Sequence, residues 1–378
     1  MPEAVIVDAI RTPIGRAAKG SLRDMRADDL AAVPLRALVE RNPEVDFAET
    51  ADILMGCGFP AGEQGYNVGR NAQLLAGIDH HVPATTVNRF CASSLQTIRM
   101  AFHAIKAGEG DQYIAAGVEA VSRFPAQPPF DPHPQLDGSD GAPWNVYIPM
   151  GITAENVARR CKVSREAQDE WAKTSQDRAV AARDSGHFDA EIVPVGEVTR
   201  DDGPRPGTTM EKLATLKPVF KEDGSVTAGN SCPLNDGAAA VLVMSEEKAN
   251  ALGLKPKARI VASSVAAIRP EIMGLGPIPA IRALLEQTGM TIDDVDIVEI
   301  NEAFAAQIVP CMDDLKIDAE KLNPFGGAIA LGHPFGMTGA RIMTTLLNNL
   351  DALDGTIGLE TMCVAGGMGQ AMIIERLN

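Results

Sequence analysis

Short apolar runs alternate with helix-like segments along much of this chain. This alternation restricts the folds that the chain could adopt more than any other feature. The runs at 4–10, 52–58 and 113–118 are short and apolar, as buried strands are. The segment 29–39, and the segment that runs from residue 95 to Gly108, repeat apolar residues at helical spacing. Strands and helices in regular alternation predict a doubly wound α/β layer.

The last third of the chain repeats this pattern. Its strand-like runs are 258–262, 295–300, 358–363 and 370–375. A helix is predicted at 279–288, with a proline suited to its start and a glycine following its end. Another helix follows the loop at Gly332 and His333. We therefore predict two similar α/β halves, each with a reactive residue in a tight loop.

A different kind of sequence separates the two halves. Residues 125–149 are rich in Pro, Asp and Gly and predict an irregular loop. Residues 164–184 predict a helix, because Ser164 can cap its start and Gly186 follows its end. Residues 200–226 mix Gly, Pro and charged residues around a few apolar ones, which is typical of a region that caps a site.

Composition excludes several classes of protein. The formal net charge of −16 argues against nucleic-acid binding. No long uncharged apolar stretch predicts a membrane span, and the first residues lack the features of a secretory signal. The six cysteines show neither C-x-x-C pairing nor zinc spacing with the histidines, so we expect free thiols, no metal site and a reducing cytoplasm.

Four segments carry residues that can take part in a chemical reaction. Cys91 stands where an apolar stretch meets a predicted helix, and a helix start lowers the pKa of a thiol, so we expect it to react as thiolate. His333 and Cys363 stand in or beside glycine-rich loops near the other end of the chain. Asn301 follows a predicted buried strand, where α/β folds place ligands. Each residue alone also fits a structural role, as a packed thiol, a turn or a helix cap, but together they indicate covalent acyl chemistry.

Taken together, these segments resemble the thiolase family, and in particular its 3-ketoacyl-CoA thiolases. The match occurs in the family's order and covers nearly the whole chain. The matching segments are 87–96, 117–123, 150–156, 226–230, 235–239, 301–304, 326–341 and 363–369.

The resemblance implies an α/β fold of two similar βαβαβαββ halves in five layers, α-β-α-β-α, with an inserted loop domain. It places the first part of the N-terminal half at 1–117 and its end at 241–257. The inserted loop domain, which contacts coenzyme A, is expected at 118–240, and the C-terminal half at 258–378.

The resemblance also assigns catalytic roles. Cys91 would carry the acyl group, His333 would activate it, and Cys363 would be the acid/base at the acetyl-CoA methyl carbon. Asn301 would position a water that forms one oxyanion hole with His333. The backbone N–H groups of Cys91 and Ala365 would form the other oxyanion hole.

Coenzyme A is expected as a substrate, with no permanently bound cofactor. Arg205 and Lys212 would lie along the coenzyme, although both also fit ordinary surface charge. The full set of residues expected to contact coenzyme A is Arg205, Lys212, Leu216, Phe220, Ala228, Cys232, Met150, Ala303 and Phe304.

Departures from the family pattern guide the choice of subtype. Cys232 replaces a serine of the pantetheine wall, and Ala365 replaces a common glycine. Pro149 stands where short-chain biosynthetic thiolases carry a histidine, after a loop that is shorter than their tetramerisation loop. Pro149 and the shorter loop favour a degradative, broader-chain enzyme and a homodimer, with a homotetramer as the alternative.

Three other readings compete. A biosynthetic acetoacetyl-CoA thiolase would use the same catalytic residues. A decarboxylating condensing enzyme of this fold carries histidine where this chain has Cys363, which argues against it. A non-catalytic relative that binds lipid or coenzyme A is disfavoured by the intact set of Cys91, Asn301, His333 and Cys363.

Overall fold

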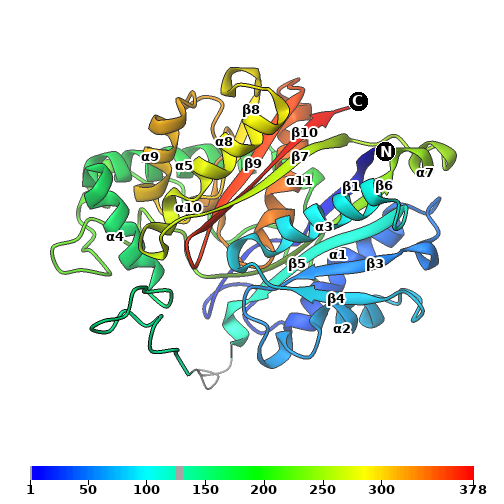
Figure 1. Cartoon of the computed structure of the whole chain (residues 1–378), viewed down its shortest axis with the longest axis horizontal. Helices are drawn as coiled ribbons and strands as arrows, with labels where there is room; N and C mark the ends of the chain where they lie inside the picture. Colours follow the sequence, from blue (N-terminus) through cyan, green and yellow to red (C-terminus); the bar gives the residue numbers. More distant parts are fainter. Residues whose placement is uncertain (1, 125–130) are drawn as a thin grey trace.

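One mixed sheet of ten strands folds over two central helices in the computed structural model, which describes residues 2–124 and 131–378 (Figure 1). The strands are β1 (Ala4–Arg11), β2 (Gly15–Arg16), β3 (Asp52–Gly56), β4 (Ala84–Val87), β5 (Gln112–Ala120), β6 (Asn235–Ser245), β7 (Ala258–Ala267), β8 (Ile297–Ile300), β9 (Ile357–Val364) and β10 (Met368–Arg376). The helices are α1 (Ala27–Arg41), α2 (Val68–Leu75), α3 (Ser93–Ala107), α4 (Met150–Cys161), α5 (Arg165–Asp184), α6 (Met210–Ala214), α7 (Glu246–Ala251), α8 (Pro277–Thr288), α9 (Ala305–Leu315), α10 (Ala328–Leu331) and α11 (Thr338–Ala352).

The sheet divides into two halves of similar topology. Its order is β4-β3-β5-β6-β1-β7-β10-β9-β8, so the N-terminal strands end at β1 and the C-terminal strands begin at β7. In the N-terminal half β4, β3 and β5 are parallel and β6 and β1 follow in antiparallel pairing. In the C-terminal half β8 and β9 are parallel, and β10 and β7 follow in antiparallel pairing. β1 and β7 join the halves over only two residue pairs, Val5 with Arg259 and Ile6 with Ala258.

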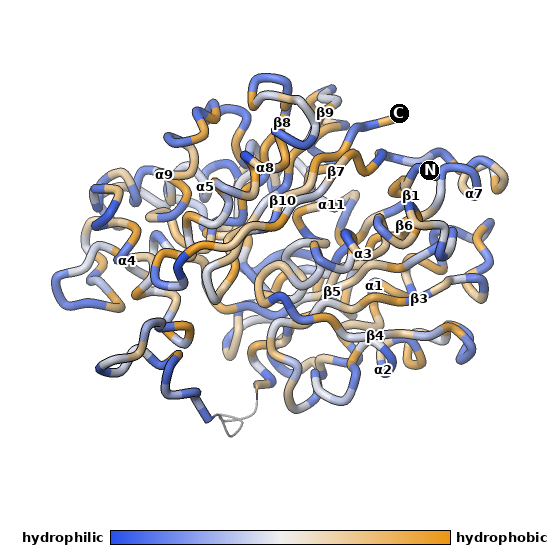
Figure 2. The backbone as a smooth tube through the Cα atoms, viewed as in Figure 1, coloured by the Kyte–Doolittle hydropathy of each residue, from blue (hydrophilic) through white to orange (hydrophobic). Residues whose placement is uncertain are grey.

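Three apolar clusters show that the two half-sheets and their helices form five layers. The central cluster packs α3 and α11 between the inner faces of both half-sheets. A second cluster packs α1 and α2 on the outer face of the N-terminal half, and a third packs α8 and α9 on the outer face of the C-terminal half. Hydrophobic residues accordingly line the central strands while the outer loops are hydrophilic (Figure 2). The predicted α-β-α-β-α arrangement is confirmed.

Local sequence explains several element ends. α3 ends at Gly108, whose φ of +75° is a left-handed conformation that glycine adopts without strain. The side chain of Ser164 accepts a hydrogen bond from the backbone N–H of Ala167 and caps α5, as predicted. α8 has proline in its first turn and ends at Gly289.

The segment that leaves the sheet between β5 and β6 comprises residues 121–234. The expected boundaries at 117/118 and 240/241 fall inside these two strands. The segment carries α4, α5 and α6, and α5 packs on α9 and α10 of the C-terminal half. Of the irregular loop expected at 125–149, residues 125–130 lie outside the described part, and the remainder is made of turns and short bridges.

No helix in the described part of the chain is long and apolar enough to cross a membrane.

Candidate active site

Cys91 lies in a short 3-10 turn, Phe90–Ala92, that leads directly into α3. Phe90 has a φ of +45°, a conformation that costs a non-glycine residue roughly 1 kcal/mol. Two local hydrogen bonds hold this turn: the N–H of Phe90 donates to Asn88 Oδ1 at 2.7 Å, and the hydroxyl of Ser93 donates to the carbonyl of Phe90 at 2.7 Å. The turn packs against β9 and the start of α11, so Cys91 faces the C-terminal half.

Burial dominates the electrostatics of the Cys91 thiol. Cys91 is 8% exposed, and burial raises its pKa to about 12. The backbone N–H groups of Ala365 and of Cys91 itself point at the sulfur and lower this pKa only in part. The expectation that the helix start would lower the pKa of Cys91 is therefore wrong. Desolvation of the charged form outweighs the local backbone dipoles.

His333 is buried, and both of its ring nitrogens have partners. Nε2 lies 3.3 Å from Asn301 Nδ2, and Nδ1 lies 2.6 Å from Thr338 Oγ1. The Thr338 hydroxyl donates its one proton to the carbonyl of Pro334 at 2.7 Å, so it accepts from Nδ1–H. This assigns the lone pair to Nε2, the nitrogen that faces Asn301. Burial, with a smaller effect from the Arg341 charge, lowers the pKa of His333 to about 3, so the imidazole is neutral.

Asn235 fixes the backbone of His333. The N–H of His333 donates to Asn235 Oδ1 at 3.0 Å, and Asn235 Nδ2 donates to the carbonyl of Gly15 at 2.9 Å. Gly332 makes this approach possible, because its φ is +117° and a Cβ there would lie 2.7 Å from the Asn235 amide.

Neighbouring strands bring Asn301 and Cys363 together. β8 and β9 pair in parallel, and the N–H of Asn301 donates to the carbonyl of Thr361 at 3.0 Å. Asn301 Oδ1 is buried and has no hydrogen-bond partner among the described residues. Cys363 is fully buried, and burial, with the neighbouring Cys91 and Cys311, raises its pKa well above the usual range of a thiol.

The predicted pantetheine wall adjoins these groups. Met150, Ala303 and Phe304 belong to the same small apolar cluster as Cys363. The Phe220 ring meets the Phe304 ring edge-on, with their centroids 6.1 Å apart. The N–H of Cys232, which is partly exposed, donates to the carbonyl of Ala303 at 3.1 Å.

The remaining residues expected to bind coenzyme A form the exposed rim of this wall. Leu216 and Phe220 are 38% and 39% exposed, large fractions for apolar side chains. Ala228 is exposed as well. Lys212 is exposed on α6, and its amine donates to the carbonyl of Gly207 at 2.7 Å.

Arg205 provides an unpaired cation near this rim. Its pKa is lowered by partial burial and by the neighbouring Arg16 guanidinium. In the described ranges neither guanidinium has a carboxylate partner. Two adjacent cations without a counter-ion are suited to an anionic ligand.

The family comparison agrees with this arrangement. The family model described as "Thiolase, N-terminal domain" matches residues 4–247, and the model described as "Thiolase, C-terminal domain" matches residues 254–376. The chain belongs to the thiolase family. This thiolase is therefore an acyltransferase.

Individual relatives span the whole thiolase chain. It is 49% identical to a beta-ketoadipyl-CoA thiolase of Acinetobacter baylyi and 47% identical to a 3-ketoacyl-CoA thiolase of Klebsiella pneumoniae, each over 100% of both chains. Among solved structures, the acetyl-CoA acetyltransferase of Bacillus anthracis is similar with a TM-score of 0.90 and 39% identity. That match covers 100% of this chain and 99% of the other.

Four polar residues that hold the site in place were not predicted from the sequence. Thr338 sets the His333 tautomer and Asn235 anchors the His333 backbone. Glu119 and Glu302 are fully buried carboxylates whose partners include backbone N–H groups on either side of His333. All four stand inside the segments that carried the family resemblance, so the signal was present, but nothing local distinguished them from their neighbours.

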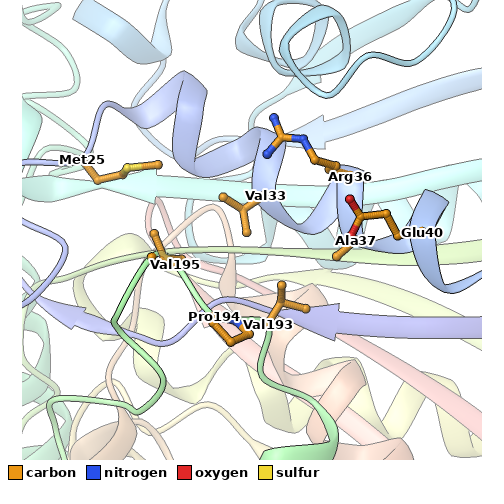
Figure 3. A pocket seen from close by; sticks show the side chains of 9 residues that line it. Met25, Val33, Arg36, Ala37, Glu40, Val193, Pro194 and Val195 are labelled. Atoms are coloured by element: carbon orange, nitrogen blue, oxygen red, sulfur yellow. The ribbon is translucent and has the colours of Figure 1, made fainter.

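Other features of this thiolase lie apart from the residues expected to be catalytic. A cavity of about 400 Å³ opens between α1 and the segment 193–196 (Figure 3). It is lined by Met25, Val33, Arg36, Ala37, Glu40, Val193, Pro194, Val195 and Gly196. Among the described residues, one group of potential metal ligands, Asp79, His80 and His81, is exposed on a loop before β4. Neither feature includes a residue assigned to catalysis.

Proposed function

We propose that this protein is a 3-ketoacyl-CoA thiolase of the degradative type, which cleaves 3-ketoacyl-CoA with coenzyme A to acetyl-CoA and a shortened acyl-CoA. One observation carries the proposal: two backbone N–H groups point at the buried Cys91 thiol, which neighbours the buried Cys363 thiol, while Asn301, at the end of the adjacent strand, contacts the neutral His333. An enzyme that forms a thioester on itself and then manages a carbon acid needs these groups together.

In the first step the Cys91 sulfur attacks the C3 keto carbon while Nε2 of His333 takes the thiol proton. A resting ion pair is disfavoured, because the pKa of Cys91 is about 12 and that of His333 is about 3. Proton transfer is therefore coupled to carbon–sulfur bond formation. The oxyanion that forms on the keto oxygen accepts from the N–H groups of Cys91 and Ala365, and such donors each supply about 3–4 kcal/mol of transition-state stabilisation.

In the second step the C2–C3 bond breaks. The electron pair moves to the enolate of acetyl-CoA, and the acyl group remains on Cys91. The thioester oxygen accepts from Nε2–H of the now protonated His333 and from a water held by Asn301. The unpartnered buried Oδ1 of Asn301 supports a bound water at this place. The thiol of Cys363, neutral because its pKa is raised, delivers its proton to C2.

In the third step the Cys363 thiolate takes the proton of the incoming coenzyme A thiol. The coenzyme sulfur attacks the acyl group on Cys91, and the Cys91 sulfur leaves with the proton of His333. Both catalytic residues return to their starting states, so the cycle is ping-pong. Read backwards, the same steps give Claisen condensation of acetyl-CoA with an acyl-CoA.

Coenzyme A would lie along the exposed rim of the inserted segment. Arg205, beside Arg16 and without a carboxylate partner in the part of the chain that the structure describes, supports binding of a phosphate there. Phe220, Phe304 and Met150 supply the apolar wall that a pantetheine arm needs on its way to Cys91.

We also propose a homodimer. β4 is the last strand of the sheet, and its four residues are all partly exposed. Tyr66, Leu74 and Leu75 beside it are 98%, 49% and 46% exposed. An unpaired strand edge flanked by exposed apolar residues favours pairing with a second copy. Analytical ultracentrifugation measures the mass directly, and a monomer would contradict this part of the proposal.

The central test is thiolysis followed by identification of the intermediate. We expect the purified protein to consume 3-ketoacyl-CoA plus coenzyme A, and to carry an acetyl group on the peptide that contains Cys91 after incubation with acetyl-CoA. Cys91→Ser should abolish both, because a serine hydroxyl is much less acidic and much less nucleophilic than a thiol. Acetyl label on another cysteine would overturn the assignment.

A substrate panel separates the degradative reading from a biosynthetic acetoacetyl-CoA thiolase. kcat/KM should be measured for acetoacetyl-, 3-ketohexanoyl-, 3-ketooctanoyl- and 3-ketoadipyl-CoA. The last substrate is included because of the relative named for it. A degradative enzyme should act on the longer chains at least as well as on acetoacetyl-CoA. Turnover restricted to acetoacetyl-CoA would assign the biosynthetic activity.

A further inference from the structure

The two residues that must exchange a proton come from different halves of the molecule. Cys91 precedes α3 of the N-terminal half, and His333 stands in the segment between α10 and α11 of the C-terminal half. Something other than chain connectivity must therefore set the distance between the thiol and the imidazole.

We propose that Glu119 is a positioning residue, whose buried carboxylate ties the segment that carries His333 to the half that carries Cys91. The inference rests on the proposed function and adds to it a residue that touches neither substrate nor reacting atoms.

The carboxylate of Glu119 bridges the two halves directly. Oε2 accepts from the N–H of Gly58, in the loop after β3, and from the N–H of Gly336, three residues after His333, both at 2.8 Å. Oε1 accepts from Gln64 Nε2 at 2.6 Å and from the N–H of Phe59 at 3.2 Å. Glu119 is the last residue but one of β5 and is fully buried.

Close packing fixes these hydrogen bonds. A Cβ at Gly58 would lie 2.8 Å from Glu119 Oε2 and 3.1 Å from Phe335 Cβ. A Cβ at Gly336 would lie 2.2 Å from the carbonyl oxygen of Val118. The backbone after His333 therefore rests against β5 with no space for a side chain, and a small shift would break its bond to Glu119.

Three other contacts anchor this segment and the start of α11, and one of them, from the N–H of Ala340 to Ser94 Oγ at 2.9 Å, also reaches the half that carries Cys91. Upstream, the N–H of Ile329 donates to Glu302 Oε2 at 3.1 Å within the C-terminal half. In the middle, the N–H of His333 donates to Asn235 on β6. Downstream, Gly336 donates to Glu119. Loss of the hydrogen bond between Gly336 and Glu119 should let the imidazole of His333 move away from the thiol of Cys91. Binding of coenzyme A uses the exposed rim and should be kept.

The experiment compares Glu119→Gln and Glu119→Asp with the wild type. In Glu119→Gln one acceptor oxygen becomes an NH₂ donor. This group faces the donors of Gln64 and Phe59 and cannot accept their hydrogen bonds, so that end of the side chain is displaced. We expect kcat for thiolysis to fall about 10- to 100-fold, the loss typical of an ångström-scale misplacement, with KM for coenzyme A within about twofold. Glu119→Asp keeps a carboxyl group and withdraws it by one methylene, so it should lose less.

Alkylation of Cys91 by iodoacetamide provides a readout that needs no coenzyme A substrate. The rate of Cys91 alkylation in His333→Asn defines the rate without any assistance from the base. In Glu119→Gln the rate of Cys91 alkylation should be at least about fivefold lower than in the wild type. Asp8→Asn is the matched control, because Asp8 is a buried carboxylate that holds Arg41 and Asn42 and contacts no site residue. It should lose stability but alkylate at the wild-type rate.

The outcomes separate the two proposals. If both Glu119 variants are less stable but alkylate and turn over like Asp8→Asn, Glu119 is merely structural and the inference is overturned. If Glu119→Gln does not fold, Glu119→Asp decides by the same comparison. If the wild type cleaves no 3-ketoacyl-CoA but Glu119→Gln still slows alkylation, the proposed function fails while the positioning role stands.

Discussion

Replacement of His333 by asparagine should change how the stability of the protein depends on pH. Burial lowers the pKa of His333 to about 3 in the folded chain, whereas an unfolded chain has a histidine pKa of about 6.5. The unfolded state therefore takes up the proton first as the pH falls. The stability that the neutral imidazole contributes is complete above pH 6.5 and is lost progressively down to about pH 3.

The magnitude follows from these two pKa values. Between pH 7.5 and pH 5.0, protonation of His333 in the unfolded chain alone should remove about 2 kcal/mol of unfolding free energy from the wild type. His333→Asn cannot titrate and should not show this loss. All other titrating groups are shared, so the difference between the two proteins isolates the one histidine.

Urea unfolding at the two pH values measures this difference. The fluorescence of Trp171, which is buried against the C-terminal half, reports unfolding. His333→Gln differs in size from His333→Asn but is equally unable to titrate, so both variants should give the same pH-dependent difference from wild type. A change below about 0.5 kcal/mol would mean that the folded protein protonates His333 freely. The neutral base of the proposed mechanism would then be refuted.

Three further perturbations test single parts of the site. Cys363→Ala should still form acetyl-Cys91 from acetyl-CoA, detected by mass spectrometry, but should lose condensation; condensation at the wild-type rate would remove Cys363 from the acid/base role. Arg205→Ala should raise KM for coenzyme A thioesters about tenfold with kcat unchanged, and an equal defect with an N-acetylcysteamine thioester would show a structural role instead. Thr338→Val removes the acceptor of the His333 Nδ1 proton and should lower kcat about tenfold, whereas Thr338→Ser should keep it; equal rates in both variants would contradict the assigned tautomer.

The sequence predicted elements whose pattern is local. The helices that follow Cys91 and His333, and the paired strands at the C-terminus, have clear periodicity and glycine or proline at their ends, and the structure has them. β6 was not predicted, because its alanine-rich run from Asn235 to Ser245 lacks alternation and is buried on both faces. β4 was not predicted as a strand either, since it has only four residues.

The pKa shifts of the site residues and the tautomer of His333 could not be predicted from the sequence. The position of Cys91 before a helix is local and was predicted, but the direction of its pKa shift depends on burial by the opposite half of the molecule. The His333 tautomer depends in the same way on where the Thr338 hydroxyl sends its proton. Glu119 stayed hidden because its partners at Gly58 and Gly336 are brought together only by the folded chain.

The way the halves interlock has a consequence for cutting the chain. Only two residue pairs of β1 and β7 join the half-sheets, yet α3 and α11 share one core and α5, from the N-terminal side of the chain, packs on α9 and α10. Gly253, in the exposed connection after α7, has open space around it. If the chain is divided at Gly253 into two separate polypeptides, the two should therefore bind each other without a peptide link. Neither polypeptide contains both Cys91 and His333, so acyl transfer should return only when both are present.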